Sequence, residues 1–374
     1  MRIDSSKGGR LFSILKEYIS YFVAVALLIV ITTVNPRFIS TGNITNLLSD
    51  MSPLLLLAIG VTFILLIGSI DLSIGAMSSC ACVIFAITVI NIGWLGMALA
   101  ILFGAVAGII SGLLYVKLKI PSFIATFGTM SIWQSLALIL SDGAPQQIGK
   151  DYWEYAQWFR IKLGIIPLPF IIAITIFIVL VVVEKKTKFG RTLFAIGGNE
   201  SAARMAGLNV EGTKIFVFIL MGIFSALAGI FFACNLKSGI PTVGEPFTLT
   251  AIAAVALGGT SLSGGKGGLI KTLAGVILVI LIQNGMNVIG VGVFWQKITF
   301  GVIILVALYL TSKMIVKTNT AGEKDAVIFE SANTPKELLN KCSLFGRMTL
   351  KPGCRVGYHQ HVGDIESYYI IIIS

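Results

Sequence analysis

The sequence predicts an all-α polytopic membrane protein of about ten transmembrane helices, with N- and C-termini cytoplasmic and a short, incomplete β tail. Of its 374 residues 56% are hydrophobic and only 12% are charged, and the mean hydropathy is +0.93. Soluble domains carry roughly 25% charged residues. The apolar blocks, about 18–22 residues long, can each cross a hydrocarbon core of ~30 Å. They lack the strict alternation of a barrel strand, so we expect helices.

Each apolar block predicts one helix. The ten predicted spans are 18–34, 53–70, 72–91, 94–116, 122–141, 166–183, 214–235, 247–262, 269–288 and 294–312. Only Asp71 separates the second span from the third, and the eighth is short and rich in glycine. Beyond these spans charged residues appear and hydrophobic runs shorten. We therefore expect a transmembrane domain over 1–317 and a cytoplasmic linker and tail over 318–374.

The distribution of basic residues predicts the orientation, because cytoplasmic loops carry an excess of Lys and Arg. With the N-terminus inside, cytoplasmic positions hold 16 Lys and Arg residues and outside positions hold six. Dropping one span would reverse every later loop, so the bias also supports an even number of spans. The formal net charge of +11 is explained by these loops. It indicates a membrane-lipid environment and no nucleic-acid partner.

The longest predicted cytoplasmic loop between spans, residues 184–213, contains signals for a short capped helix. Asn199 can cap it, and Glu200 would lie in its first turn, at the positive end of the helix dipole. Ala202, Ala203 and Ala206 bring small side chains to this helix, and Gly207 is suited to end it. Such a helix could transmit the movement of a cytosolic motor protein to the adjoining membrane spans. An amphipathic helix resting on the membrane surface explains the same residues, and physical reasoning leaves both open.

Three motifs resemble the permeases of ribose, xylose and galactose ABC importers. They read GRTLFAIGGNESAARMAGLNV at 190–210, ILLIGSIDLSIGA at 64–76 and ALGGTSLSGGKGG at 256–268. The similarity spans roughly residues 10–316, and Ser69 departs from it where the family usually has glycine. The resemblance implies a coupling loop for an ATPase. Its candidate residues are Gly197, Gly198, Asn199, Glu200, Ala202, Ala203 and Gly207.

The resemblance also implies the other parts of the importer. Two permease subunits, identical or different, would form the pathway, an ABC ATPase subunit would dock on the cytoplasmic loops, and an extracytoplasmic sugar-binding protein would deliver the solute. ATP and Mg would bind the ATPase subunit. The glycine-rich run at 256–268 does not fit the phosphate-loop pattern G-x-x-x-x-G-K-[ST], because Gly267 follows Lys266.

Polar residues within the apolar blocks are candidates for the translocation pathway or its gate. They are Asp71, Ser73, Gln134, Ser135, Gln283, Asn284 and Asn287. A carboxylate inside a membrane is costly and is often functional. Asp71 could belong to a gate or could cap the following helix together with Ser73. The amides could bind a sugar, but polar side chains also join helices.

The tail contains the only two histidines of the chain, His359 and His361, followed by Glu366. Their spacing resembles the first metal motif of cupins, small β-barrel proteins. The chain reads four isoleucines and a serine at 370–374, where a cupin would continue with glycine and a second half-barrel. A tail this short cannot close a barrel. A divalent metal is therefore not expected to bind this chain alone.

These observations predict the permease subunit of an ABC importer in the cytoplasmic (inner) membrane, carrying a ribose-like monosaccharide and performing no covalent chemistry itself. One rival is an ion-coupled secondary transporter of small polar solutes, which would usually place ionisable groups at mid-membrane. A second rival is a membrane-anchored, metal-dependent cupin enzyme, which would need a complete barrel.

Overall fold

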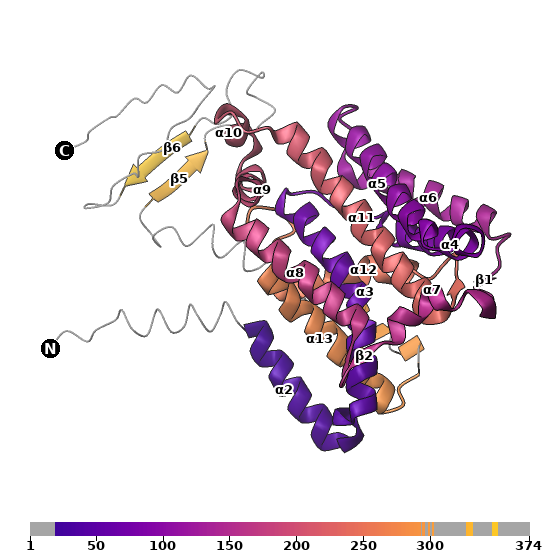
Figure 1. The fold of residues 1–374 in the computed structure, drawn as a ribbon. Coiled ribbons are helices and arrows are strands. Elements are labelled where there is room, and N and C mark those ends of the chain that lie inside the picture. The colour runs from indigo at the N-terminus through magenta and orange to yellow at the C-terminus, as the bar shows by residue number, and fades with distance from the viewer. Residues whose placement is uncertain are drawn as a thin grey trace. The chain divides into compact units, whose positions relative to one another are not determined.

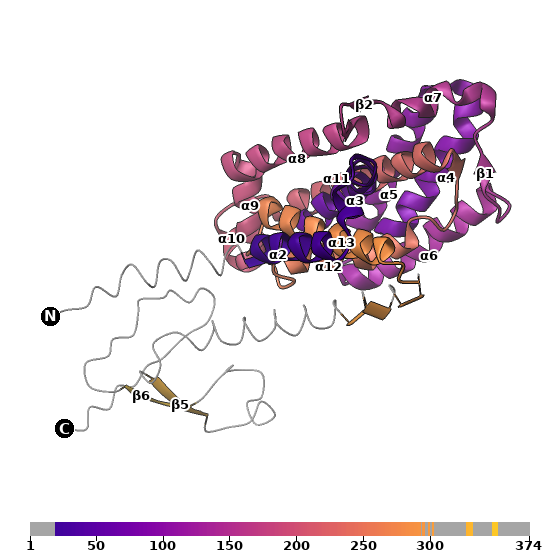
Figure 2. The same cartoon turned by 90° about the horizontal axis from the view of Figure 1, so that it is seen from below.

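The computed structural model describes residues 19–292, 294–295, 298–299, 301–302, 327–331 and 346–350. The chain divides into two compact units, Met1–Thr311 and Ser312–Ser374. Figures 1 and 2 show the elements of both units. The predicted boundary at 317/318 stays a prediction.

The first unit is built from apolar helices. In its described part seven are long and apolar enough to cross a membrane. They are α3 (Thr41–Leu66), α4 (Ile74–Ile92), α5 (Leu95–Val116), α6 (Ser122–Leu140), α8 (Leu168–Lys186), α11 (Val210–Leu236) and α13 (Leu269–Val288). Two shorter apolar helices are α2 (Ile19–Val34) and α12 (Glu245–Gly258).

The first nine predicted spans correspond to these helices, and the tenth, 294–312, lies mostly outside the described residues. The second span was placed wrongly, because α3 begins at Thr41 rather than near residue 53. Ser40 caps α3 by accepting a hydrogen bond from the Asn43 amide, 3.4 Å away. Pro53 consequently lies inside the helix.

Helix α11 lies at the centre of the unit and packs against α3, α4 and α5. Glycines allow the close approach of α5 and α11. A Cβ atom at Gly104 would collide with the carbonyl of Gly222, and one at Gly108 would collide with the carbonyl of Phe218. Small residues at helix contacts are typical of membrane bundles, where van der Waals packing replaces the hydrophobic effect.

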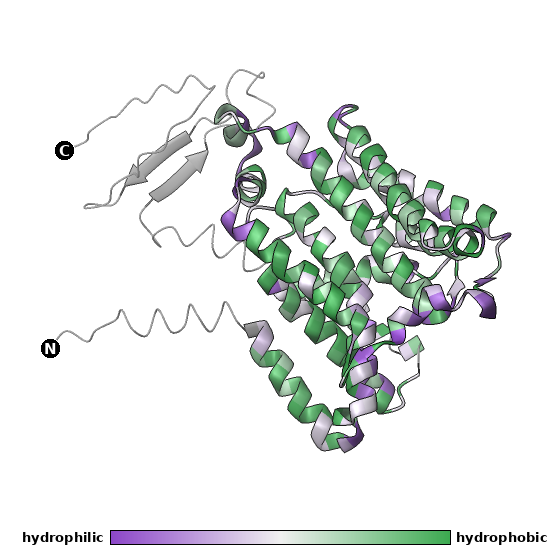
Figure 3. Cartoon of the chain, in the orientation of Figure 1, coloured by the Kyte–Doolittle hydropathy of each residue, from purple (hydrophilic) through white to green (hydrophobic). Residues whose placement is uncertain are grey.

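The outer helices expose apolar side chains. Figure 3 shows green, hydrophobic residues along most of the long helices. The apolar windows of α3, α4 and α11 are mostly buried, whereas only 33%, 28% and 22% of those of α5, α6 and α8 are buried. Exposed apolar surface of this extent is expected where lipid replaces water.

Short elements lie at the two ends of α8. The antiparallel pair β2 (Lys162–Leu163) with β3 (Ile166–Pro167) directly precedes α8, and a second antiparallel pair, β1 (Gln146–Gln147) with β4 (Ser238–Gly239), packs against α4. The helical turns between β1 and β2 are η2 (Lys150–Tyr152), α7 (Glu154–Gln157) and η3 (Trp158–Arg160). At its C-terminal end α8 leads into α9 (Lys188–Gly198) and α10 (Glu200–Met205). In both views α10 and β1 lie at opposite ends of the helical body (Figures 1 and 2).

The described part of the second unit is one antiparallel strand pair. β5 (Val327–Ser331) pairs with β6 (Gly346–Leu350) in the register Val327–Leu350 to Ser331–Gly346. The candidate metal ligands His359, His361 and Glu366 lie outside the described residues, so a metal in the tail stays untested.

Candidate functional site

The predicted capped helix is present as α10. The Oδ1 atom of Asn199 accepts a hydrogen bond from the Ala202 amide at 3.0 Å, and Glu200 lies in the first turn. The chain leaves the helix at Gly207, whose φ of +76° favours glycine. Helix α9 is capped in the same way by Thr187, which accepts from the Gly190 amide. The α9–α10 segment, residues 188–205, is therefore two capped helices.

The small residues of α10 do not all face outward. Ala203 is only 3% exposed and packs into the protein core, whereas Ala202 and Ala206 are exposed. Sequence reasoning treated these alanines alike. A partner protein could reach Ala202 and Ala206 but not Ala203, so a bulky substitution at Ala203 would disturb this chain itself.

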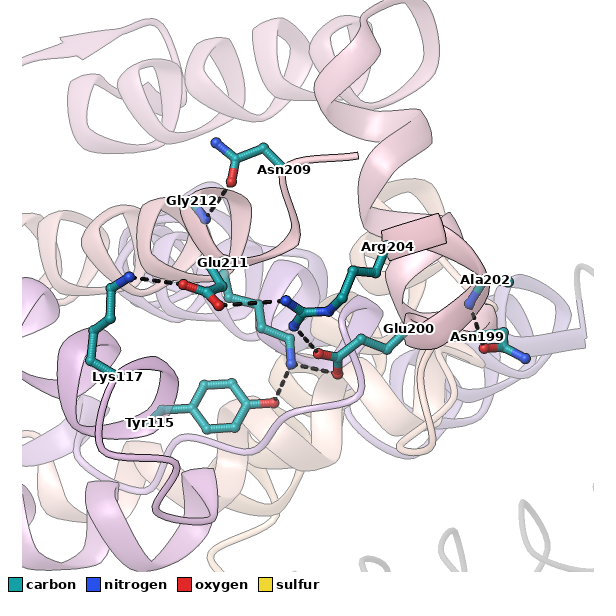
Figure 4. A network of polar contacts seen from close by, with 10 residues as sticks. Tyr115, Lys117, Asn199, Glu200, Ala202, Arg204, Asn209, Glu211 and Gly212 are labelled. Carbon is teal, nitrogen blue, oxygen red and sulfur yellow. Dashed lines mark hydrogen bonds and ion pairs between the residues drawn. The ribbon is translucent and has the colours of Figure 1, made fainter. Parts of the chain in front are cut away.

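Ionic contacts fasten α10 to the neighbouring helices (Figure 4). The Glu200 carboxylate lies 2.6 Å from Nζ of Lys214 in α11 and 3.3 Å from Arg204. Lys214 also donates to the hydroxyl of Tyr115 in α5 at 2.9 Å. Burial raises the pKa of the Glu200 carboxyl, but the hydrogen bonds and charges of Lys214 and Arg204 outweigh it and hold that pKa below its ordinary value.

Glu211 adds further ion pairs to this network at the surface (Figure 4). Its carboxylate lies 3.4 Å from Arg204 and 2.8 Å from Lys117, which directly follows α5. These side chains are more exposed than Lys214, so each pair contributes little alone. Together the contacts hold α10 against α5 and α11.

The three sequence motifs meet at one point, which we call the motif junction. It consists of Leu66 at the end of α3 and Gly68 just after it, Gly197 and Gly198 at the end of α9, and 264–265 in the loop after α12. The Leu66 carbonyl accepts a hydrogen bond from the Gly265 amide at 3.0 Å. A Cβ atom at Gly197 would overlap with that same carbonyl. The α9–α10 segment is thus in backbone contact with α3 and the glycine-rich loop.

Glycine is required in this loop for two reasons. Gly264 and Gly265 have φ values of +87° and +68°, which side chains disfavour. A Cβ atom on Gly264 would lie 2.9 Å from Gly68 Cα and 3.0 Å from Gly197 Cα. Glycines at these positions therefore allow a tight turn with close backbone packing.

Asp71 closes a local turn before α4. Its Oδ1 atom accepts hydrogen bonds from the amide and the hydroxyl of Ser73, at 2.7 Å and 2.6 Å. Its Oδ2 atom is buried without a hydrogen-bond partner among the described residues. Side chains of α6 hold the adjacent backbone, since Ser122 and Thr126 accept from the Ile70 and Leu72 amides. These contacts support the structural reading of Asp71, and a gating role stays a proposal.

A pocket lined by five polar and five apolar residues, called the polar pocket below, lies near the C-terminal end of α13. It encloses about 200 Å³ and is lined by Leu47, Asp50, Pro53, Phe232, Asn235, Phe247, Ile280, Gln283, Asn284 and Asn287. Three of these, Gln283, Asn284 and Asn287, were candidates from the sequence. Asp50 and Asn235 were not among the candidates: Asp50 lies in a predicted loop, and Asn235 is the last residue of the predicted span 214–235. Asp50 could have been recognised from the sequence, because it is an acidic residue just before an apolar block.

Asn284 fits both roles that the sequence left open for the amides, namely binding a sugar and joining two helices. It lines the pocket and exchanges two hydrogen bonds with Asn43 of α3, at 2.7 Å and 3.1 Å. The amide pair therefore joins α3 to α13 beside the pocket. Gln134 donates to the Pro241 carbonyl at 2.9 Å, and its neighbour Ser135 is exposed. Neither lines the pocket, so the structure does not bring the two predicted amide clusters together.

Comparison with known proteins identifies the family. Residues 43–308 match the family described as the branched-chain amino acid transport system permease component. The chain belongs to this family. The match covers well over half of the permease and ends before the tail, so the cupin resemblance receives no support from it.

Curated relatives agree over most of their length. The permease is 40% identical over 292 residues to the ribose import permease protein RbsC of Bacillus subtilis, covering 77% of this chain and 90% of the relative. It is 35% identical over 320 residues to RbsC of Escherichia coli K12, covering 84% and 99%. It is 36% identical over 303 residues to the L-arabinose transport system permease protein AraH of the same strain, covering 79% and 89%. No solved structure matches the chain.

Family membership and the apolar helices together establish the class of protein. The permease is a multi-pass protein of the cell inner membrane that acts in transport. A transport permease is not expected to perform covalent chemistry. An ion-coupled secondary transporter is disfavoured, because the family and the relatives belong to transport systems with separate permease components.

Proposed function

We propose that this permease is the membrane-spanning subunit of an ABC importer that carries a monosaccharide, with ribose the first solute to test. Relatives that cover most of the chain are ribose and L-arabinose permeases, which supports a sugar. The motif junction carries the proposal, because it joins a capped, partly exposed segment directly to a spanning helix. ATP hydrolysis would occur on a separate ABC ATPase subunit.

The α9–α10 segment is the proposed docking element for that ATPase. Ala202 and Ala206 present a small-residue face at which another backbone could approach closely. A displacement of α10 would reach α11 and α5 through Lys214 and Tyr115, and α3 through Gly197. The alternative of a helix resting passively on the membrane does not explain these backbone contacts.

The polar pocket is the proposed solute contact on the pathway. Sugars present hydroxyl groups, which amides and carboxylates recognise by hydrogen bonds. Gln283, Asn287 and Asp50 offer such groups beside the apolar Phe232 and Phe247. A pocket of about 200 Å³ suits a small solute, since drug-sized ligands occupy about 300–1,000 Å³. Asp71, Gln134 and Ser135 lie outside this pocket.

The finer topology follows from the same proposal. The end that carries α10 would face the cytoplasm and the end that carries β1 would face outward, with ten spans and both termini of the chain inside. A second permease subunit, identical or homologous, would complete the pathway, and an extracytoplasmic sugar-binding protein would deliver the solute. The cupin-like tail and its candidate metal have no role in this mechanism.

Uptake into proteoliposomes tests the function. The permease, its cognate ATPase and its binding protein are reconstituted, and labelled ribose uptake is measured with internal or external ATP, with and without ionophores. We expect uptake that requires ATP on the ATPase side and is insensitive to ionophores. Uptake that runs without ATP and collapses with ionophores would identify an ion-coupled transporter instead.

A further inference from the structure

Glu184 is a buried carboxylate in the last turn of α8. It is 5% exposed, and its Oε2 atom accepts a hydrogen bond from the Leu269 amide at 2.9 Å. Leu269 is the first residue of α13, and its N-cap residue, Gly268, supplies no side-chain cap. The first amides of a helix lack intrahelical acceptors. A residue 85 positions away in sequence therefore caps α13.

Two glycines lie in close contact with Glu184. Gly268 has a φ of +132°, and a Cβ atom there would collide with Oε1 of Glu184. Gly190, in the first turn of α9, approaches the backbone of Glu184 so closely that a Cβ atom would overlap with its carbonyl. Glu184 thus contacts the α9–α10 segment through its backbone and α13 through its side chain.

The contact reaches the helix that carries the polar pocket. Gln283 lies fourteen positions after Leu269 on this helix, a rise of about 21 Å at ~1.5 Å per residue. A tilt or rotation applied at the first turn of α13 would therefore move Gln283 and Asn284 at its other end. The contacts of Glu184 are separate from the motif junction, because Gly190, Gly268 and Leu269 do not belong to that junction.

We propose that Glu184 is a positioning residue that couples movement of the α9–α10 segment to α13 and so to the polar pocket. This inference rests on the proposed importer function. A merely structural cap would stabilise the permease without affecting how much solute moves for each ATP hydrolysed. The ratio of solute uptake to ATP hydrolysis therefore distinguishes coupling from stability.

The test uses the reconstituted importer with two substitutions of similar length. Glu184→Gln keeps an oxygen that can accept from the Leu269 amide, whereas Glu184→Met offers none. We expect Glu184→Gln to keep uptake per ATP within about twofold of wild type. We expect Glu184→Met to lower it about tenfold while ATP hydrolysis continues, as for the loss of a hydrogen bond to a charged group. Lys186→Met, exposed on the same turn, is the control and should transport normally.

The outcomes separate this inference from the function on which it rests. If wild type shows no ATP-driven uptake, the importer proposal fails and the coupling role fails with it. If wild type transports and Glu184→Met has normal uptake per ATP, only the coupling role is overturned. Should Glu184→Met not assemble, Gly268→Ala decides, because it displaces the carboxylate but keeps its charge. Normal uptake per ATP in that variant would equally overturn the inference.

Discussion

The ammonium of Lys214 lies 2.6 Å from the carboxylate of Glu200, and this pair fastens α10 to the central helix α11. The two side chains differ in environment, since that of Lys214 is 8% exposed and that of Glu200 is 43% exposed. Lys214 also lies over the ring of Tyr115, 4.7 Å from its centroid. A buried ammonium with these partners fixes the position of α10 more firmly than a surface ion pair would.

Removing the Lys214 ammonium should loosen α10. We expect Lys214→Met to lower the free energy of unfolding by about 1–3 kcal/mol, because buried hydrogen bonds to charged groups are lost and Tyr115 and Glu200 lose a partner. The matched control is Lys117→Met, which breaks the exposed 2.8 Å pair with Glu211 and should cost under about 1 kcal/mol. Thermal unfolding in detergent measures both. Equal losses would show that Lys214 has no special role.

Adjacent glycines at the end of α9 should respond differently to alanine. A Cβ atom at Gly197 would overlap with the Leu66 carbonyl, whereas one at Gly198 meets nothing within 4 Å. Gly197→Ala should therefore separate α9 from α3, destabilise the permease by about 1–3 kcal/mol and impair ATP-driven uptake. Gly198→Ala should be neutral or slightly stabilising, because alanine favours helix. Similar stability and uptake in the two variants would contradict the close contact at the motif junction.

The amide pair beside the pocket predicts a thermodynamic coupling. Asn43→Ala and Asn284→Ala each break the same two hydrogen bonds, so the double variant should cost less than the sum of the single ones. Interhelical polar contacts in membranes contribute about 0.6 kcal/mol, with a maximum near 1.7 kcal/mol. A double-mutant cycle on unfolding in detergent measures this coupling. Strict additivity would argue against the pair.

Gln283 tests the function of the pocket, whereas the Asn43–Asn284 cycle tests its stability. It lines the pocket and lies one position before Asn284 on α13. Under the pathway proposal, Gln283→Ala should reduce ribose uptake several-fold with little change in the unfolding temperature. A Gln283→Ala permease with unchanged uptake would remove this residue from the proposed pathway.

The lowered pKa of Glu200 predicts that α10 becomes less firmly packed against α5 and α11 in strong acid. Because folding lowers this pKa from its ordinary value of 4.5, the carboxylate adds stability that is fully present above that value. This stability is lost as the pH falls through the lower, folded pKa. Hydrogen exchange of α10 amides should thus be constant from pH 7 to 5, after correction for intrinsic rates, and rise in stronger acid. Glu200→Gln should remove this dependence, and its persistence in that variant would exclude Glu200 as the source.

Sequence reasoning located most helices because a membrane span needs about twenty apolar residues, a signal visible in any window. The start of α3 was missed because it carries polar residues, including Asn43, which pairs with Asn284, and Asp50, which lines the pocket. Capping at Asn199 was predictable because it depends on neighbours in sequence.

Contacts between distant segments could not be predicted in the same way. The meeting of Leu66, Gly197 and Gly265 depends on how two helix ends and a loop pack, although their motifs were each noted. Likewise, Ala203 is buried while Ala202 is exposed, a distinction set by the side of α10 that faces the core. Glu184 offered no pattern at all, since its partner amide lies 85 residues away.

Co-purification with the cognate ATPase tests the docking of that subunit on the α9–α10 segment most directly. Tagged permease is isolated in mild detergent as wild type, as Ala206→Arg and as Gln157→Arg, an exposed control on α7 at the opposite end. We predict that wild type and Gln157→Arg retain the ATPase, while Ala206→Arg loses it and keeps a normal unfolding temperature. Full retention by Ala206→Arg, or no ATPase with wild type, would contradict the account.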